Sequence, residues 1–196
     1  MEQGDRQPVV LVIAGPNGAG KSTAAPLLVH DMAGIDRFIN ADAIARGFSP
    51  FKPDLAAVTA GRLMLEHMNT LVQDRQDFAL ETTLSGVRLA KKLAAMQQEG
   101  YRVQLMFLWL PTAELAVRRV DQRVRLGGHS IPEQTVRRRY TRGIENLFDV
   151  YIPIADVWRV FDNARAVPTQ VAHGGIGKQT QIINQAAWDA MQAENG

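Results

Sequence analysis

The segment AGPNGAGKST, residues 14–23, decides how this chain begins to fold. It follows an apolar run at 9–13 that is typical of a buried strand, and it precedes a segment expected to be helical over 21–32. The residues Gly15, Gly20, Lys21 and Ser22 have the spacing of a P-loop in its strand–loop–helix context. Glycines let successive N–H groups turn inward, and the next helix adds its positive end, so the loop predicts a phosphate cradle.

The parts of this loop have separate expected tasks. Lys21 is expected to reach the β- and γ-phosphates of a nucleoside triphosphate, and the Ser22 hydroxyl to bind Mg²⁺. ATP is the expected nucleotide, because the chain has no Asn-Lys-x-Asp segment to read guanine. The predicted nucleotide-binding residues are Gly15, Pro16, Asn17, Gly18, Ala19, Gly20, Lys21, Ser22 and Thr23.

Beyond the loop, predicted strands alternate with predicted helices. Strands are expected at 9–14, 37–40, 77–83, 101–110 and 158–163. Helices are expected at 21–32, from 42, and at 53–74, 86–98, 112–125, 132–147 and 179–192. This order predicts an α/β fold of the P-loop NTPase class, with a five-stranded, mostly parallel sheet flanked by helices. Ligands of such sheets bind beyond the carboxyl ends of the strands, where this chain carries INAD, LETT, WLPT and FDN.

Length and composition limit the kind of protein. A chain of 196 residues fits one domain, 1–196. Because it has no cysteine, disulfides and thiolate metal sites are excluded and a cytoplasmic location is expected. The start MEQGDRQPVV lacks the pattern of a signal peptide, and no apolar run approaches the roughly 20 residues of a membrane span. We therefore expect no membrane contact.

Two carboxylates at the ends of predicted strands are candidates for catalysis. Asp42 follows the second strand, and it is expected either to take the proton of an acceptor hydroxyl or only to cap the next helix. Glu81 ends the third strand, and it is expected to bind the acceptor or Mg²⁺, or to be a surface carboxylate. The neighbouring Thr82 and Thr83 would bond the acceptor or cap a turn. A glutamate in this place could instead activate water, so a regulatory ATPase is the second hypothesis.

Residues 118–142 concentrate positive charge. They hold eight arginines and two acidic residues, in a chain whose net charge is only +2. One interpretation is a helical lid over about 123–147, in which Arg123 and Arg138 face the triphosphate and exclude water. The other is an ordinary solvated helix face. A nucleic-acid-binding module or polynucleotide kinase is less favoured, because Tyr140 is the one aromatic residue in the basic window.

Several segments together resemble one family. They are AGPNGAGKST, FINADAIA, AGRLMLE, FALETTLSG, GYRVQLMFLWL, RVRLGGHSIPEQTVRRRYTRGIENL and VWRVFDN. In combination they resemble the zeta-toxin-like P-loop kinases, especially their small stand-alone bacterial branch, over residues 10–163. The resemblance implies an ATP- and Mg²⁺-dependent phosphotransferase with a lid. In zeta toxins the acceptor is UDP-N-acetylglucosamine, phosphorylated on a sugar hydroxyl.

The resemblance also implies roles for single residues. The implied catalytic residues are Lys21, Asp42 as the base, Arg123, Arg138 and Arg139. The implied acceptor-binding residues are Glu81 and Thr82 beside Asp42, and we expect Arg62 of AGRLMLE and His129 to bind the acceptor with them. The implied metal ligands are Ser22 and Glu81. His129 is a departure, because the family's second lid arginine falls near GGHSIP, and the arginines of RRRY are expected to compensate.

The partners follow from the same resemblance. We expect ATP and a small-molecule acceptor, either a nucleotide-sugar like UDP-N-acetylglucosamine or another hydroxyl compound. An antitoxin protein is a candidate partner, although neither toxicity nor an antitoxin follows from the resemblance alone.

Overall fold

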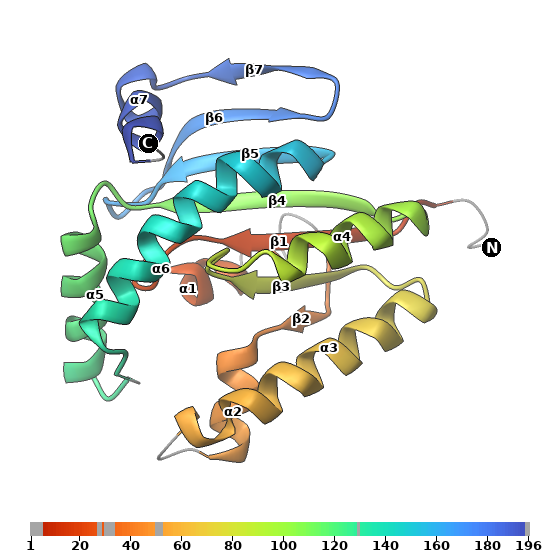
Figure 1. Ribbon diagram of the computed structural model, residues 1–196, viewed down its shortest axis with the longest axis horizontal. Helices are drawn as coiled ribbons and strands as arrows, with labels where there is room; N and C mark the ends of the chain where they lie inside the picture. Colours follow the sequence, from red (N-terminus) through yellow and green to blue (C-terminus); the bar gives the residue numbers. More distant parts are fainter. Residues whose placement is uncertain (1–5, 27–28, 30–33, 50–52, 129, 195–196) are drawn as a thin grey trace.

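A seven-stranded sheet with helices on both faces forms the body of the protein. The computed structural model describes residues 6–26, 29, 34–49, 53–128 and 130–194. The strands lie in the order β2-β3-β1-β4-β5-β6-β7, and each neighbouring pair from β2 to β5 is parallel. The predicted α/β class with a mostly parallel sheet is therefore confirmed, although the sheet has seven strands and not the predicted five (Figure 1).

The elements follow one another in the predicted alternation. The strands are β1 (Val9–Ala14), β2 (Phe38–Ile39), β3 (Phe78–Thr82), β4 (Arg102–Trp109), β5 (Val157–Asp162), β6 (Thr169–Gly175) and β7 (Lys178–Ile182). The α-helices are α1 (Lys21–Ala25), α2 (Ala41–Phe48), α3 (Ala57–Gln73), α4 (Arg88–Gln98), α5 (Ala113–Arg125), α6 (Glu133–Asn146) and α7 (Gln185–Ala193). Short helical turns are η2 (Pro53–Ala56), η3 (Leu147–Tyr151) and η4 (Ile152–Ile154).

The last part of the chain differs from the prediction. The expected helix at 179–192 was wrong at its start, because β6 and β7 form an antiparallel hairpin on β5 and α7 begins at Gln185. The hairpin turn contains Gly177 at φ +69°, a backbone angle that glycine adopts at little cost. The polar sequence KQTQI of β7 is exposed along its whole length, and so it lacks the hydrophobic alternation that would predict a strand.

The sheet separates two hydrophobic layers because alternate residues of β1 point to opposite faces. Val10 and Val12 belong to the larger cluster, which includes residues of α3, α4, α5, α6 and α7. Leu11 and Ile13 face the smaller cluster with Ala25 of α1. Burial on both faces explains why the first strand is a continuous apolar run rather than an alternating one.

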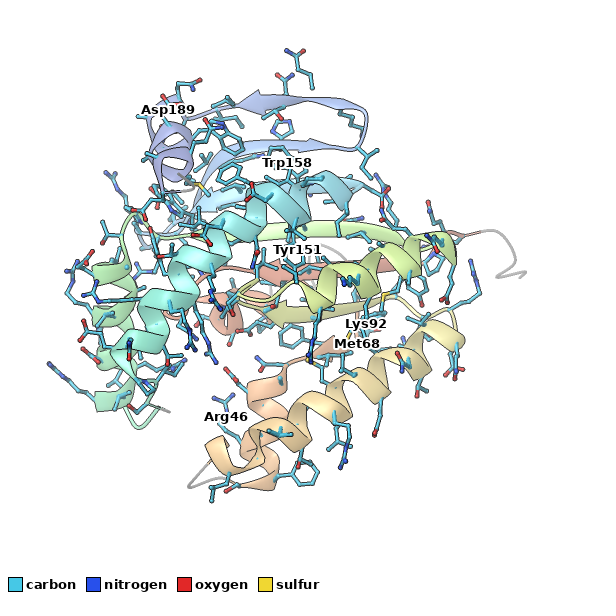
Figure 2. All side chains as sticks on the ribbon, viewed as in Figure 1. Arg46, Met68, Lys92, Tyr151, Trp158 and Asp189 are labelled. Carbon is cyan, nitrogen blue, oxygen red and sulfur yellow. The ribbon has the colours of Figure 1, made fainter. Side chains whose placement is uncertain are left out.

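An aromatic cluster attaches the C-terminal hairpin and helix to this body. The rings of Trp158 on β5 and Trp188 on α7 stack with centroids 5.8 Å apart, and Phe148 meets Trp188 edge-on at 5.2 Å. Trp158 is labelled in Figure 2. Stacked and edge-on aromatic pairs add to the free energy of burial. The hairpin is thus continuous with the sheet, and α7 is packed against it.

The arm formed by α2, η2 and α3 extends beyond β2 at one edge of the sheet (Figure 1). Its own small core consists of Ala45, Ala56 and Ala60. Met68, farther along α3, is fully buried against the main cluster. Among the residues that the structure describes, no helix is both long and apolar enough to cross a membrane.

Candidate active site

The P-loop is held in shape by close approach of its glycines to neighbouring backbone. Gly15 has φ +142°, and a Cβ atom there would lie 2.3 Å from the carbonyl oxygen of Leu108. Gly18 has φ +79°, and its Cβ would lie 2.8 Å from the carbonyl oxygen of Ala116. A side chain at either position would strain the backbone and displace β4 or α5. The loop therefore needs glycine at both positions for its shape.

Lys21 stands at the start of α1 with only 6% of its surface exposed. Its Nζ donates hydrogen bonds of 2.9 Å to the carbonyl oxygens of Gly15 and Pro16, and it lies 3.8 Å from Oε1 of Glu81. Burial lowers the pKa of Lys21 to about 8, against the opposing effect of Glu81 and Asp42. The ammonium group is thus a poorly solvated cation inside the loop, suited to pairing with phosphate.

Glu81, at the end of β3, lies against the first turn of α1. Its Oε2 atom accepts a hydrogen bond of 2.8 Å from the Ser22 hydroxyl and one of 2.7 Å from Nδ2 of Asn40. Glu81 is partly buried, and its other oxygen faces Lys21. The carboxylate is therefore fixed by three groups, which come from the P-loop side and from the end of β2.

The oxygen atoms of Ser22 and Glu81 suit a hard cation such as Mg²⁺. No group of three or more His, Asp or Glu side chains able to hold a metal occurs among the residues that the structure describes. Mg²⁺ is usually bound by one or two protein oxygens together with water and substrate phosphates, so this pair fits that mode of binding.

Asp42 lies in the first turn of α2 but does not cap it. The cap is Asn40, whose Oδ1 accepts a hydrogen bond of 3.0 Å from the backbone N–H of Ala43. The expectation that Asp42 serves only as the helix cap was therefore wrong. Its carboxylate is exposed and lines the same cavity as Lys21 and Glu81. Arg46, one turn later on α2, lines that cavity too.

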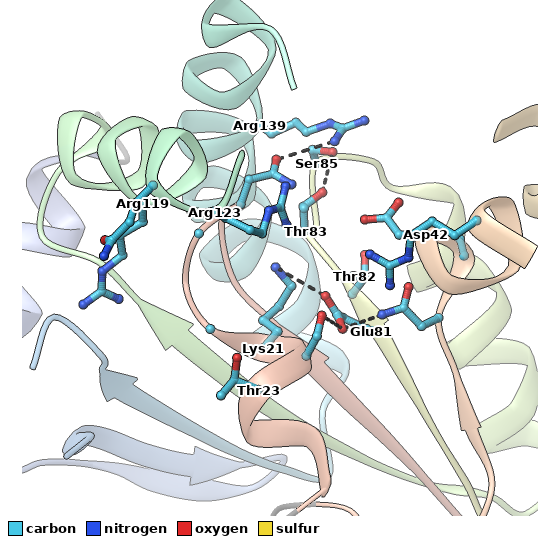
Figure 3. A pocket seen from close by; sticks show the side chains of 18 of the residues that line it. Lys21, Thr23, Asp42, Glu81, Thr82, Thr83, Ser85, Arg119, Arg123 and Arg139 are labelled. Atoms are coloured by element: carbon cyan, nitrogen blue, oxygen red, sulfur yellow. Dashed lines mark hydrogen bonds and ion pairs between the residues drawn. The ribbon is translucent and has the colours of Figure 1, made fainter. Parts of the chain in front are cut away.

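The cavity joins these groups in a volume of about 550 Å³. Figure 3 shows Asp42 on one side, Arg123 on the other, and Lys21 and Glu81 between them. The predicted site residues that line it are Asn17, Gly18, Gly20, Lys21, Ser22, Thr23, Asp42, Glu81, Thr82, Arg123 and Arg139. It therefore brings together side chains from the P-loop, β3, α2, α5 and α6.

The arginines of α5 and α6 divide between the cavity and solvent. Arg123 of α5 and Arg139 of α6 line the cavity, and Nη1 of Arg139 lies 3.5 Å from Oδ1 of Asn17 in the P-loop. Arg138 is exposed and lies outside the lining. Arg137 pairs with Glu133 of its own helix and with Glu114 of α5. The helices are thus tied to each other, and one face of the pair points to the phosphate loop.

Among the other predicted acceptor-binding residues, Arg62 differs from the expectation, whereas Thr82 has one of the two roles expected for it. Arg62 of α3 does not line the cavity, and its Nε lies 3.8 Å from Glu66 on the exposed side of the helix. The Thr82 hydroxyl accepts a hydrogen bond of 3.1 Å from the N–H of Leu84, although Thr82 lines the cavity. His129 lies outside the described residues.

The structure adds cavity residues that the sequence did not single out. They are Asn40, Ala41, Arg46, Met64, Ser85, Arg119, Gln122 and Leu126. Thr83, which was expected to bond the acceptor or cap a turn, lines the cavity as well. Arg119 donates hydrogen bonds of 2.8 Å and 2.7 Å to the carbonyl oxygens of Asn163 and Ala164, fixing the segment after β5. Asn40 could have been found from INAD, because an asparagine before a helix is a common cap. Arg46 could have been found from its position four residues after Asp42.

A family model identifies the family of this chain. The zeta toxin family model matches residues 1–168, which confirms the resemblance predicted from the sequence segments. An uncharacterised protein of Haemophilus influenzae is 32% identical over 126 residues, which are 64% of this chain and 88% of that protein.

Solved structures share the fold at low identity. A complex of AvrRxo1-ORF1 and AvrRxo1-ORF2 with sulphate ions matches at TM-score 0.76 and 16% identity, covering 97% of this chain. This chain spans 65% of that chain's length. A chain of the PezAT toxin–antitoxin system of Streptococcus pneumoniae matches at TM-score 0.64 and 15% identity, over 98% of this chain and 86% of that chain. A gluconokinase from Sinorhizobium meliloti matches at TM-score 0.54 and 15% identity, over 96% and 94%.

Proposed function

Because this chain belongs to the zeta toxin family, we propose that it is an ATP-dependent phosphotransferase that moves the γ-phosphate of ATP to a hydroxyl group of a small molecule. The observation that carries the proposal is the position of Asp42. Its carboxylate shares one cavity with the P-loop lysine, while Asn40 supplies the cap of α2. Asp42 is therefore available to receive a proton from an acceptor hydroxyl beside the phosphate loop.

The cations around the cavity have a second task in this reaction. A phosphoryl group in transfer carries negative charge on its three peripheral oxygens, and fixed cations stabilise that charge. Lys21, Arg123 and Arg139 line the cavity from three different elements and would surround the group. When bound between Ser22 and Glu81, Mg²⁺ would neutralise charge on the β- and γ-phosphates.

The hydrolytic alternative is less well supported. An ATPase needs a carboxylate or amide that orients a water molecule toward the γ-phosphate. Glu81 is the nearest candidate on β3, but Ser22 and Asn40 both donate to its Oε2 atom. Its other oxygen faces the ammonium of Lys21. A carboxylate engaged in this way is better suited to holding the loop and a cation than to acting as a base.

A nucleotide-sugar of the UDP-N-acetylglucosamine kind is the proposed acceptor. Asp42 and Arg46 are separated by one turn of α2, so both reach the cavity from the same side. A hydroxyl at Asp42 and a phosphate at Arg46 would occupy neighbouring positions, with the hydroxyls of Thr83 and Ser85 on the adjoining wall. An acceptor that carries both a sugar hydroxyl and phosphate fits this arrangement.

The proposal extends to location and partner. A chain with no cysteine that uses ATP is suited to the cytoplasm. The PezAT neighbour comes from a toxin–antitoxin system, and so an antitoxin protein is the proposed macromolecular partner. Growth arrest on expression of the chain, relieved by a co-expressed partner, is the expected result. Normal growth of cells that make active enzyme would contradict the toxin role without affecting the kinase.

Incubation with γ-labelled ATP and a panel of nucleotide-sugars, nucleotides and sugar acids tests the activity. Label should appear on one acceptor class, identified by mass spectrometry. Asp42→Asn should slow the transfer by about 10²- to 10⁴-fold, the range of general-base catalysis, with ATP binding retained. The matched control is Asp121→Asn, an exposed aspartate on α5 outside the cavity. Rapid ATP consumption without acceptor, unchanged in Asp42→Asn, would favour the ATPase instead.

A further inference from the structure

We propose that Asn40 is a positioning residue that couples the phosphate loop to the helix carrying the proposed base. The inference rests on the proposed function only in the role it gives to Asp42. Asn40 lies between β2 and α2 and is 8% exposed. Its side-chain amide contacts Glu81 on the side of the P-loop and the backbone of Ala43 in α2. Glu81 accepts hydrogen bonds from Ser22 and from Asn40 through the same oxygen, Oε2.

Both ends of the Asn40 amide are engaged. The Nδ2 group donates to Oε2 of Glu81 at 2.7 Å, and Oδ1 accepts from the N–H of Ala43 at 3.0 Å. Glu81 is in turn held by the Ser22 hydroxyl at 2.8 Å and faces the ammonium of Lys21. A continuous series of contacts therefore runs from the first turn of α1, through Glu81 and Asn40, to the first turn of α2.

Strand register explains why these two side chains meet. Ile39 of β2 pairs with Leu80 of β3 in a parallel ladder, so Asn40 and Glu81 are the next residues on adjacent strands. Neighbouring strands lie roughly 4.8 Å apart, a distance that one amide and one carboxylate can bridge. The register thus places Asn40 beside Glu81 just where the chain turns into α2.

The chemistry of the amide fits both tasks at once. The side-chain amide of asparagine carries a hydrogen-bond donor, the NH₂ group, and an acceptor, the carbonyl oxygen. Serine at this position would still cap α2, because serine and asparagine are about equally good caps, but it lacks a second arm to donate to Glu81. Alanine would lose both contacts. The two replacements therefore separate the capping role from the contact with Glu81.

The first test compares Asn40→Ser and Asn40→Ala in steady-state phosphotransfer. In Asn40→Ser we expect kcat to fall by about 10- to 100-fold, as for residues that orient a ligand group, with the KM for ATP little changed. The matched controls are Asn184→Ser and Asn184→Ala, because Asn184 caps α7 by accepting from Ala187 at 3.1 Å, outside the cavity. These should leave kcat unchanged. If Asn40→Ser retains wild-type kcat and only Asn40→Ala is slow, Asn40 is merely a cap and the proposal is overturned.

A double-mutant cycle with Glu81→Gln supplies a readout that simple destabilisation would not move. If Asn40 acts through Glu81, the double variant Asn40→Ser/Glu81→Gln should be about as slow as the slower single variant. The proposal is overturned if the double variant loses kcat by the product of the two single losses, and if the melting temperature of each variant falls together with its kcat. If wild-type protein transfers phosphate to no acceptor, the proposed function fails instead. The same cycle measured on ATP hydrolysis then still tests the link between Asn40 and Glu81.

Discussion

The two sides of the cavity are built in different ways. On the phosphate side, main-chain carbonyls and a nearly buried Lys21 form the surface, and Gly15 and Gly18 contact β4 and α5 too closely for any side chain. On the acceptor side, the exposed side chains of Asp42 and Arg46 extend from an arm whose own core consists of alanines. If Asp42 and Arg46 bind the acceptor as proposed, phosphate recognition depends on backbone shape and acceptor recognition on a few replaceable side chains.

This difference teaches where specificity resides. A P-loop must bind the same triphosphate in every kinase, so its geometry is tightly constrained by the surrounding sheet. At its base, the arm is joined to the rest of the site by the hydrogen bond between Asn40 and Glu81. Under the proposed function, substitutions on the arm beyond Asn40 should change the acceptor without disturbing the phosphate loop. Variants on the two sides should accordingly have different kinetic signatures.

The largest effect is expected on the phosphate side, from Lys21→Met. It removes the ammonium group that faces Glu81 in the cavity, and transfer should slow by about 10³-fold, the upper range for loss of a single charge-stabilising donor. Rates are measured with saturating ATP and acceptor. Lys178→Met on the exposed strand β7 is the control and should be neutral. A loss smaller than tenfold would show that the arginines, not the loop, hold the transferring group.

A comparison of adjacent arginines on α6 should give the next largest effect. Arg139 lines the cavity and approaches Asn17, so Arg139→Gln should slow transfer by about 10²-fold. Arg138 faces solvent, so Arg138→Gln should change the rate by no more than about twofold. Equal losses would mean that α6 moves on nucleotide binding, as the predicted lid over 123–147 requires.

The phosphate side was also the more predictable one from sequence. Its shape depends on contiguous residues, and glycine, lysine and serine at fixed spacing in a strand–loop–helix leave little freedom. The alternation of elements likewise predicted five parallel strands in this fold class. The hairpin at Thr169–Gly175 and Lys178–Ile182 was missed because its polar edge strand has no buried face to mark it.

The acceptor side was predictable only in part. Asp42 was singled out from its place after a strand, but the helix cap proved to be Asn40. Arg62 was expected in the site, yet α3 turns it toward Glu66. Which residues of the arm reach the cavity depends on how α2 and α3 pack on each other. That packing uses small alanines whose spacing carries little directional signal in the sequence.

Arg46→Gln should give a smaller and more selective effect. If Arg46 binds a phosphate of the acceptor, its loss should raise the KM for the acceptor by about tenfold, as for one hydrogen bond to a charged group. The KM for ATP should not change. Arg62→Gln is the matched control, since Arg62 belongs to the same arm but lies outside the cavity. A selective rise in the KM for ATP would instead assign Arg46 to the nucleotide.

The smallest expected effect is a dependence of ATP affinity on pH. Burial lowers the pKa of Lys21 to about 8 in the ligand-free protein, and bound phosphate favours the charged form. Below that pKa Lys21 is already protonated, whereas above it binding must include uptake of a proton. The Kd for ATP should therefore rise by about fivefold between pH 8 and pH 9.

Isothermal titration at fixed free Mg²⁺ measures this dependence. It should also detect net proton uptake on binding at pH 9, through the effect of buffer ionisation enthalpy. Lys21→Met should bind ATP more weakly at every pH, and its proton uptake on binding should lack the contribution of residue 21. A wild-type Kd that stays constant over this range would mean that Lys21 remains fully charged in the empty loop. The attraction of Lys21 to the carboxylates of Glu81 and Asp42 would then outweigh the cost of burying its charge. The phosphate loop would carry both its positive charge and its shape before ATP binds.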